Sequence, residues 1–248
     1  RNHAGILIRG DIANAITVLG SGKFYGMHRT GTSNITGNLT LDAGSIALSG
    51  AGTFIGLENG TGAVTIGNTK APSINITGTA AFTGVKATAA LPNAAAIAIK
   101  TTTIDMTGGT FNGNFSGTGA TTIASTGALT LSGTATYNGT VGATGALASG
   151  TLTYTVPSIT LNTGTPAFNL GGVFATGVLT GTTTGDVTVN AGAFTLKNAA
   201  NAATFTISGN CAIAGGDIYM SGMVANTAAI ALNINGNFSL NTGRFEFD

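Results

Sequence analysis

The chain has 248 residues, of which 9 are Lys or Arg and 8 are Asp or Glu, giving a formal net charge of +1. Charged residues make up only 7% of it, against roughly 25% in an ordinary soluble domain. So little net charge gives no electrostatic reason to bind nucleic acid or an anionic membrane. The 43% of hydrophobic residues also argues against a disordered chain.

Residues 1–31 differ in composition from the rest of the chain. They hold four of the nine basic residues and both histidines: Arg1, Arg9, Lys23, Arg29, His3 and His28. We therefore predict that this segment is an N-terminal cap or junction. Residues 32–248 are predicted to form the repetitive body of the protein.

A degenerate repeat organises that body. Its unit has two apolar residues flanking a third residue, then Ser, Thr or Asn, then glycine, then a second short strand. The clearest copies are residues 74–82, 129–137, 205–213 and 232–240. The anchoring glycines, which we predict to lie at turns or corners, are Gly37, Gly78, Gly108, Gly133, Gly164, Gly192, Gly209 and Gly236. Most successive gaps between them are 25–31 residues, which is typical of stacked repeat architectures.

The strands within each unit alternate between apolar residues and Thr, Ser or Asn, so one face of each strand is apolar. A unit this short cannot bury that face alone, and stacking on its neighbours would bury it. We predict an all-β protein, a β-solenoid like a parallel β-helix, with a core of Ile, Leu, Val and Phe and with Ala where the cross-section narrows. Outward Thr and Asn would form ladders between coils. The alternative is a tandem array of small β-sandwiches.

Two segments depart from the repeat. Residues 87–99 are rich in alanine and are predicted to form a loop or a single helical turn that leaves a coil. Residues 243–248 stop in mid-alternation without a polar cap, although solenoids need caps to cover their strand edges. We expect this end either to continue in a longer polypeptide or to dock another copy.

Residues 106–185 contain no Asp, Glu, Lys, Arg or His. Without such groups this stretch has no general acid or base. Glycine and polar residues interrupt it too often for a transmembrane helix. Covering an uncharged surface costs little desolvation, so we predict that this stretch is the self-association face.

Candidate catalytic, cofactor and metal residues are not found. His3 and His28 have no carboxylate near them in sequence, and Cys211 lies within a strand pattern that is typical of a buried residue. The acidic residues Asp42, Asp105, Asp186 and Asp217 are widely spaced, although stacking could bring Asp186 over Asp217. The terminal pair of Glu246 and Asp248 is interpreted as solvated charge. We therefore expect no enzyme activity.

Outward threonines also suggest an ice-binding face. That function requires the same Thr-x-Thr on successive coils at one lateral position, and residues 151–155 show no such repetition in the sequence. The aromatic residues are few and mostly Phe, so we expect most of them in the core rather than on sugar-binding platforms.

Residues 207–220 and 232–247 resemble repeats of very large surface adhesins of Bacteroidota, which are exported by the type IX secretion route. Residues 35–45 are similar to haemagglutinin-type β-helical repeats. This resemblance implies an extracellular, rod-like element at the cell surface that associates with itself and contacts glycans or another cell. The alternatives are a phage or viral fibre segment and a β-helix enzyme that acts on polysaccharides.

Overall fold

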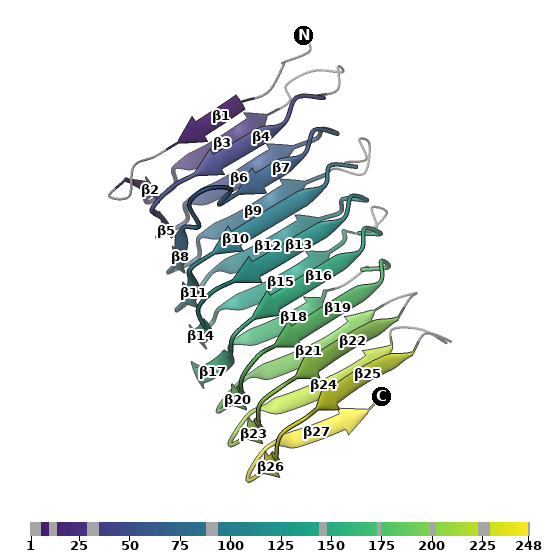
Figure 1. The fold of residues 1–248 in the computed structure, drawn as a ribbon. Coiled ribbons are helices and arrows are strands. Elements are labelled where there is room, and N and C mark those ends of the chain that lie inside the picture. The colour runs from purple at the N-terminus through teal and green to yellow at the C-terminus, as the bar shows by residue number, and fades with distance from the viewer. Residues whose placement is uncertain are drawn as a thin grey trace.

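The computed structural model describes residues 6–9, 14–28, 35–87, 94–143, 148–172, 175–198, 202–222 and 229–247. Within these ranges the regular structure is β-strand throughout, and the strands form three sheets of nine strands each. The chain visits the sheets in a fixed order, here named A, B and C, and one strand from each makes one coil. Figure 1 shows the coils stacked along one axis, with the two ends of the chain at opposite ends of the stack.

Sheet A consists of β1 (Ile6–Arg9), β4 (Leu39–Asp42), β7 (Val64–Ile66), β10 (Ile97–Thr101), β13 (Thr121–Ser125), β16 (Leu152–Val156), β19 (Leu179–Thr183), β22 (Ala203–Ile207) and β25 (Ile230–Ile234). Sheet B consists of β2 (Ala15–Val18), β5 (Ser45–Leu48), β8 (Ser73–Ile76), β11 (Thr103–Met106), β14 (Leu129–Gly133), β17 (Ile159–Gly164), β20 (Val187–Val189), β23 (Cys211–Ile213) and β26 (Phe238–Leu240). Sheet C consists of β3 (Lys23–His28), β6 (Thr53–Glu58), β9 (Ala81–Lys86), β12 (Thr110–Phe115), β15 (Thr136–Val141), β18 (Ala167–Gly171), β21 (Ala193–Asn198), β24 (Asp217–Gly222) and β27 (Arg244–Phe247).

Each strand pairs with the strands of the same sheet in the coils before and after it. In sheet A, for example, β13 is parallel both to β10 and to β16. The same parallel pairing runs through all three sheets in the part of the chain that the structure describes. This confirms the predicted β-solenoid, and it excludes tandem sandwiches, whose strands would be joined by antiparallel hairpins.

The lengths of the coils extend slightly beyond the predicted range of 25–31 residues. In sheet A, the coil that runs from Val64 to its partner Ile97 is much longer than the next one, which runs from Ile97 to Thr121. The same sequence motif occurs at two different places in a coil. Its copy at 129–133 is β14 of sheet B, whereas its copy at 205–209 includes the end of β22 of sheet A. The short gap between Gly192 and Gly209 arises because these glycines lie at different corners.

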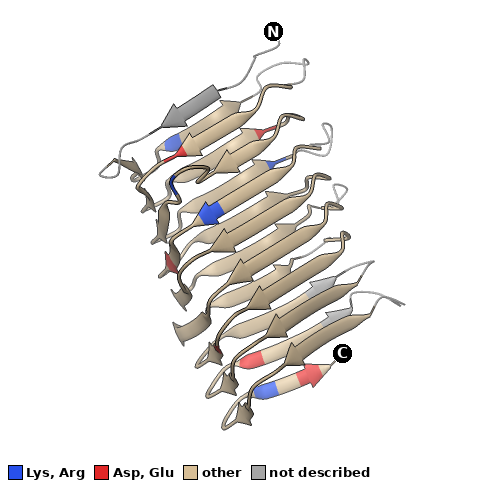
Figure 2. Ribbon diagram, viewed as in Figure 1, with Lys and Arg blue, Asp and Glu red and all other residues tan. Residues whose placement is uncertain are grey.

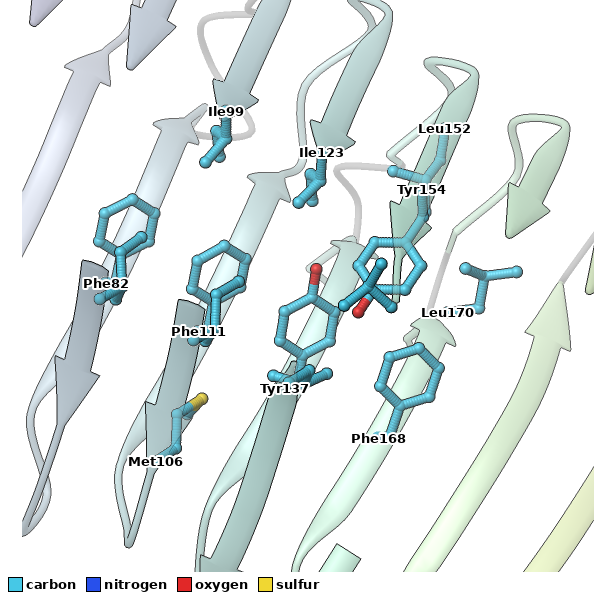
Figure 3. Close-up of a cluster of buried hydrophobic side chains, with 14 of the residues drawn as sticks. Phe82, Ile99, Met106, Phe111, Ile123, Tyr137, Leu152, Tyr154, Phe168 and Leu170 are labelled. Atoms are coloured by element: carbon cyan, nitrogen blue, oxygen red, sulfur yellow. The ribbon is translucent and has the colours of Figure 1, made fainter. Parts of the chain in front are cut away.

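A continuous stack of aromatic rings forms the centre of the core. The rings project inward from sheet C at one position of successive coils: Phe24, Phe54, Phe82, Phe111, Tyr137, Phe168 and Phe194. Neighbouring rings are nearly parallel, with centroids 4.6–5.2 Å apart. Figure 3 shows the middle of this stack, with the aliphatic side chains of sheets A and B packed beside it. The expectation that the aromatic residues lie mostly in the core is confirmed.

Large and small residues alternate between facing sheets so that the cross-section stays filled. Where sheet C carries Gly113, the side chain of Ile123 from sheet A occupies the space that a Cβ would need. Further along, sheet C carries Leu170, and the facing residue of sheet A is Gly181. Buried alanines such as Ala80 and Ala135 lie at the corners that precede strands of sheet C. This agrees with the predicted core composition.

Residues 1–31 contain β1, β2 and β3, which pair in register with β4, β5 and β6. The segment predicted to be a cap or junction therefore supplies the first coil of the stack. The predicted loop or helical turn at 87–99 lies partly outside the described residues, and its last three residues belong to β10.

Candidate functional surface

The eight anchoring glycines lie at the corners between sheets. Gly78, Gly108 and Gly192 lie between sheets B and C, and Gly133 and Gly164 are the last residues of β14 and β17 at the same corner. Gly209 and Gly236 are between sheets A and B, and Gly37 precedes a strand of sheet A. Corners of successive coils stack closely: a Cβ on Gly164, where φ is +90°, would lie 2.5 Å from the carbonyl oxygen of Gly133. Both the backbone conformation and the lack of space therefore favour glycine there.

The uncharged stretch forms the middle of the solenoid. Its described residues include β12 to β19, which contribute to all three sheets. Figure 2 shows the charged residues mainly in the coils toward the two ends, with an uncharged region between them. Sheet A has no charged residue in any strand from β13 to β25. The surface of the central coils thus consists of hydroxyl, amide and aliphatic groups.

Ladders of side-chain amides satisfy one another on the outer face of sheet C. Asn138 donates to the side-chain oxygen of Asn112 at 2.8 Å, and Asn169 donates to that of Asn138 at 3.0 Å. The predicted outward ladders of polar residues are therefore present across these three coils. Such pairs reinforce the register of parallel strands.

Near the N-terminal end, three residues of sheet C meet in adjacent coils. The nearly buried carboxylate of Glu58 lies 2.5 Å from Nδ1 of His28 and 3.1 Å from Nζ of Lys86. The contact with His28 is an ion pair only when the imidazole is protonated. Sequence reasoning missed this cluster because its members are far apart along the chain, although each is separated from the next by a single coil.

The carboxylate of Asp42, at the end of β4, caps the corner that follows β7. It accepts hydrogen bonds from the backbone N–H and the hydroxyl of Thr69, at 3.0 and 2.7 Å, and from the N–H of Lys70. Burial alone would raise the pKa of Asp42, but these hydrogen bonds outweigh it and lower the pKa below its ordinary value. Asp42 is therefore a structural carboxylate that fixes a turn.

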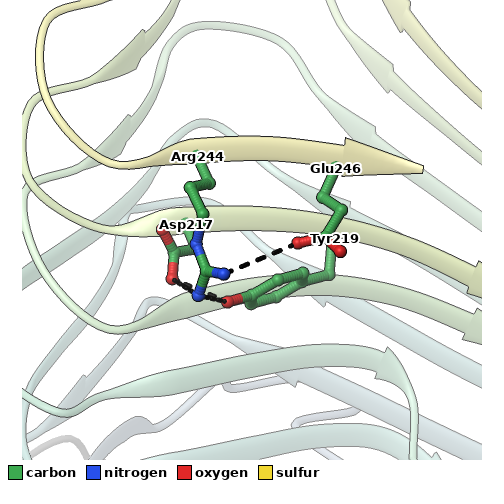
Figure 4. A network of polar contacts seen from close by, with 4 residues as sticks. All are labelled: Asp217, Tyr219, Arg244 and Glu246. Atoms are coloured by element: carbon green, nitrogen blue, oxygen red, sulfur yellow. Dashed lines mark hydrogen bonds and ion pairs between the residues drawn. The ribbon is translucent and has the colours of Figure 1, made fainter. Parts of the chain in front are cut away.

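The strands β24 and β27 carry a partly exposed polar cluster (Figure 4). The hydroxyl of Tyr219 donates to Asp217 at 2.7 Å, and Arg244 lies 3.2 Å from the same carboxylate. Both contacts lower the pKa of Asp217. The hydrogen bond between Tyr219 and Asp217 also raises the pKa of Tyr219. Arg244 also approaches Glu246, with 3.8 Å between the charged groups. The single guanidinium of Arg244 therefore contacts both carboxylates of the cluster.

The other candidate residues are dispersed. Asp186 precedes β20 of sheet B and accepts the N–H of Asn210, whereas Asp217 begins β24 of sheet C, so stacking places them on different sheets. Asp105 is exposed in β11. Cys211 is buried in β23, and burial raises the pKa of its thiol to about 11. His3 and Asp248 lie outside the described residues.

Threonines on sheet A repeat in register, contrary to the expectation from the sequence. Thr153 pairs with Thr180, which pairs with Thr204, and two residues later Thr155, Thr182 and Thr206 are paired in the same way. We call these six residues the threonine array. The sequence hides the array because the coil from Thr153 to Thr180 is longer than the coil from Thr180 to Thr204. The intervening residues also differ, being Tyr154, Gly181 and Phe205.

Metal ligands do not gather in the described ranges: no group of three or more His, Cys, Asp or Glu residues lies close enough to hold an ion. No helix long and apolar enough to cross a membrane occurs among these residues either. Comparisons with protein families, with curated proteins and with solved structures gave no match.

Proposed function

We propose that this chain is a rigid segment of an extracellular filament or adhesin at the cell surface, and that it acts by structure and contact rather than by catalysis. The observation that carries the proposal is the combination of an unbroken ladder in three sheets with central coils that carry no charge. The resemblance of residues 207–220 and 232–247 to Bacteroidota adhesin repeats supports the same function.

The parallel ladders support the mechanical part of this proposal. Each coil is joined to the next by backbone hydrogen bonds in all three sheets, and the aromatic stack continues the contact through the core. Bending the rod would require these hydrogen bonds and ring contacts to lengthen on one side together. A solenoid of this kind resists bending without disulfides, and the sequence has only one cysteine.

The uncharged central coils support the proposed self-association. A partner surface that covers the central coils would desolvate hydroxyl and amide groups but no ions, which removes the largest cost of burying a surface. Low net charge also leaves little repulsion between copies. We therefore propose lateral self-association along these coils, and association of this kind should depend only weakly on salt.

Electron microscopy and sedimentation velocity test this proposal. The native chain should form rods or bundles of several copies, and Thr160→Lys, which places a charge on the outer face of sheet B in the uncharged middle, should shift it to single particles. The matched control is Thr17→Lys, at the same lateral position of sheet B in the first coil. A native chain that remains a compact monomer at high concentration would contradict the proposal.

The polar cluster of β24 and β27 is the observation that favours a second candidate, an enzyme acting on polysaccharides. It brings Asp217, Arg244 and Glu246 together on one face. The lowered pKa of Asp217 makes it a poor general acid near neutral pH, so we favour the structural function. Release of reducing ends from polysaccharides by the native chain, lost in Asp217→Asn, would reverse this preference.

A further inference from the structure

The threonine array is a two-dimensional lattice of identical groups. It has three rows, one each on β16, β19 and β22, and two columns, and the register of the sheet fixes both directions. Strands of a sheet are about 4.8 Å apart and alternate residues of a strand about 6.6 Å apart. One column continues to Thr122 on β13, whose partner is Thr153. Each position presents a methyl group and a hydroxyl group side by side.

The array faces outward and its hydroxyls are available. Thr153 and Thr180 are exposed, and the other four members are half-buried. The hydroxyl of Thr206 accepts a hydrogen bond from Asn233 at 3.4 Å, and the other five have no partner within the described part of the chain. Each hydroxyl can therefore donate one hydrogen bond and accept others.

The rows are held rigidly because the side chains between the two columns belong to the core. Tyr154 and Phe205 point inward and are fully buried, and Gly181 lies between them. The backbone between rows is also paired: the N–H of Leu152 donates to Val178 at 2.9 Å, and that of Leu179 donates to Ala202 at 3.0 Å. The lattice is thus set before any ligand arrives, which reduces the entropic cost of binding.

A lattice of identical groups favours a ligand that is itself periodic. A small soluble molecule can meet only one or two positions of the array, whereas on a crystal surface every repeat adds a contact. The array contains no charge and no aromatic platform, which disfavours ionic ligands and sugar rings. Hexagonal ice repeats at a spacing close to that between strands, hydroxyls replace lattice waters, and methyl groups order the water around them.

From this match we propose that the threonine array of sheet A binds ice. The occupant is the ice lattice itself, docked across β16, β19 and β22, with the column at Thr122 extending the contact by one coil. The array lies on sheet A and is partly within the central coils, whereas Thr160→Lys tests self-association on sheet B, so the two proposals are tested by separate variants.

Partition into slowly growing ice tests the proposal. The native chain, labelled at its amino groups, should be enriched in polycrystalline ice and should inhibit ice recrystallisation. Thr180→Tyr and Thr153→Tyr, which place a bulky ring above the lattice, should each lower ice enrichment severalfold. Thr180→Val keeps the shape and removes one hydroxyl, and should give a smaller loss.

Matched controls on another face distinguish the array from a general surface effect. Thr160 and Thr188 lie outward on sheet B in the coils that contain β16 and β19. The variants Thr160→Tyr and Thr188→Tyr should therefore leave ice enrichment unchanged. Circular dichroism and thermal melting establish that each variant is folded. Exclusion of the native chain from ice, or an equal loss in the sheet B variants, would overturn the proposal. So would a Thr180→Tyr variant that alters only sedimentation, because the array would then bind another copy.

Discussion

Gly181 of β19 leaves open the space that the ring of Phe205 fills in the next coil. A Cβ on Gly181 would overlap ring atoms of Phe205 and would also meet the side chain of Leu170 at 3.1 Å. In the coil before, Tyr154 occupies the same position. Gly181 is therefore enclosed by large side chains of neighbouring coils. A large residue in one coil fills the space that a small residue leaves in the next.

This packing makes Gly181→Ala destabilising. The added methyl group has no free space, and overpacking of this kind costs about 1–3 kcal/mol. The free energy of unfolding in urea measures the effect. The double variant Gly181→Ala with Phe205→Leu should be less destabilised than the sum of the two single variants. Additive losses would show that the glycine and the ring are not coupled.

Removing the hydroxyl of Tyr154 should stabilise the protein. Tyr137 and Tyr154 have ring centroids 5.6 Å apart and their hydroxyls point toward one another (Figure 3), yet neither oxygen makes a well-formed hydrogen bond among the described residues. Burial raises the pKa of both phenols well above the ordinary value, so they stay neutral. A buried hydroxyl without a partner costs about 1–3 kcal/mol, and Tyr154→Phe should recover part of this.

Chemical denaturation measures that gain. Phe168→Tyr is the converse control, because it adds a hydroxyl to a fully buried ring of the same stack, and it should destabilise. A loss of stability in Tyr154→Phe would mean that the hydroxyl is hydrogen-bonded in solution.

The stability that Asp42 contributes should depend on pH. Its pKa is lowered in the folded state, so the contribution is complete above the unfolded pKa of about 3.9 and is lost as the pH falls through the folded value. We expect Asp42→Asn to cost about 1–3 kcal/mol at neutral pH and to differ less from the native chain in acid. Urea denaturation at several pH values measures this difference, and Asp105→Asn, at an exposed position, should change little. An Asp42→Asn deficit that persists unchanged in acid would contradict the assignment.

The aromatic stack should be sensitive to the loss of an inner ring. Phe111 is fully buried, with centroids 4.7 Å from those of both Phe82 and Tyr137. Phe111→Ala should lower the free energy of unfolding by about 3–5 kcal/mol. Phe247→Ala removes a ring that is 68% exposed and serves as the control. Equal effects of the two variants would mean that burial of Phe111 in the stack does not stabilise the protein.

The architecture follows from local patterns that the sequence displays directly. Alternation of apolar and polar residues fixes which side of each strand is buried, and glycines such as Gly133 and Gly164 mark the corners where φ is positive. Stacking of such strands leaves few solutions, so a β-solenoid with an Ile, Leu, Val and Phe core is predictable. The inward direction of Cys211 follows from the same alternation.

The contacts between coils are not predictable in the same way, because they depend on register. Insertions at corners lengthen some coils of sheet A and not others, so residues that meet in space have no constant separation along the chain. The pairing of Thr153 with Thr180 and the contact of Glu58 with His28 both depend on that register. Whether Gly209 turns between sheets A and B or between B and C cannot be decided from the motif, since both corners use the same residues.

The direction of the backbone hydrogen bonds has a consequence for length. A whole coil, such as that from Thr180 to Thr204, advances the stack by only about 4.8 Å, the spacing of neighbouring strands. The full stack therefore spans about 40 Å, whereas the same residues in an extended chain would reach roughly twenty times as far. Most of the residues therefore build the cross-section of the rod, and few of them add to its length. A fibre that bridges two cells with this fold must join a great many coils, and each of them adds three new faces on which a contact can form.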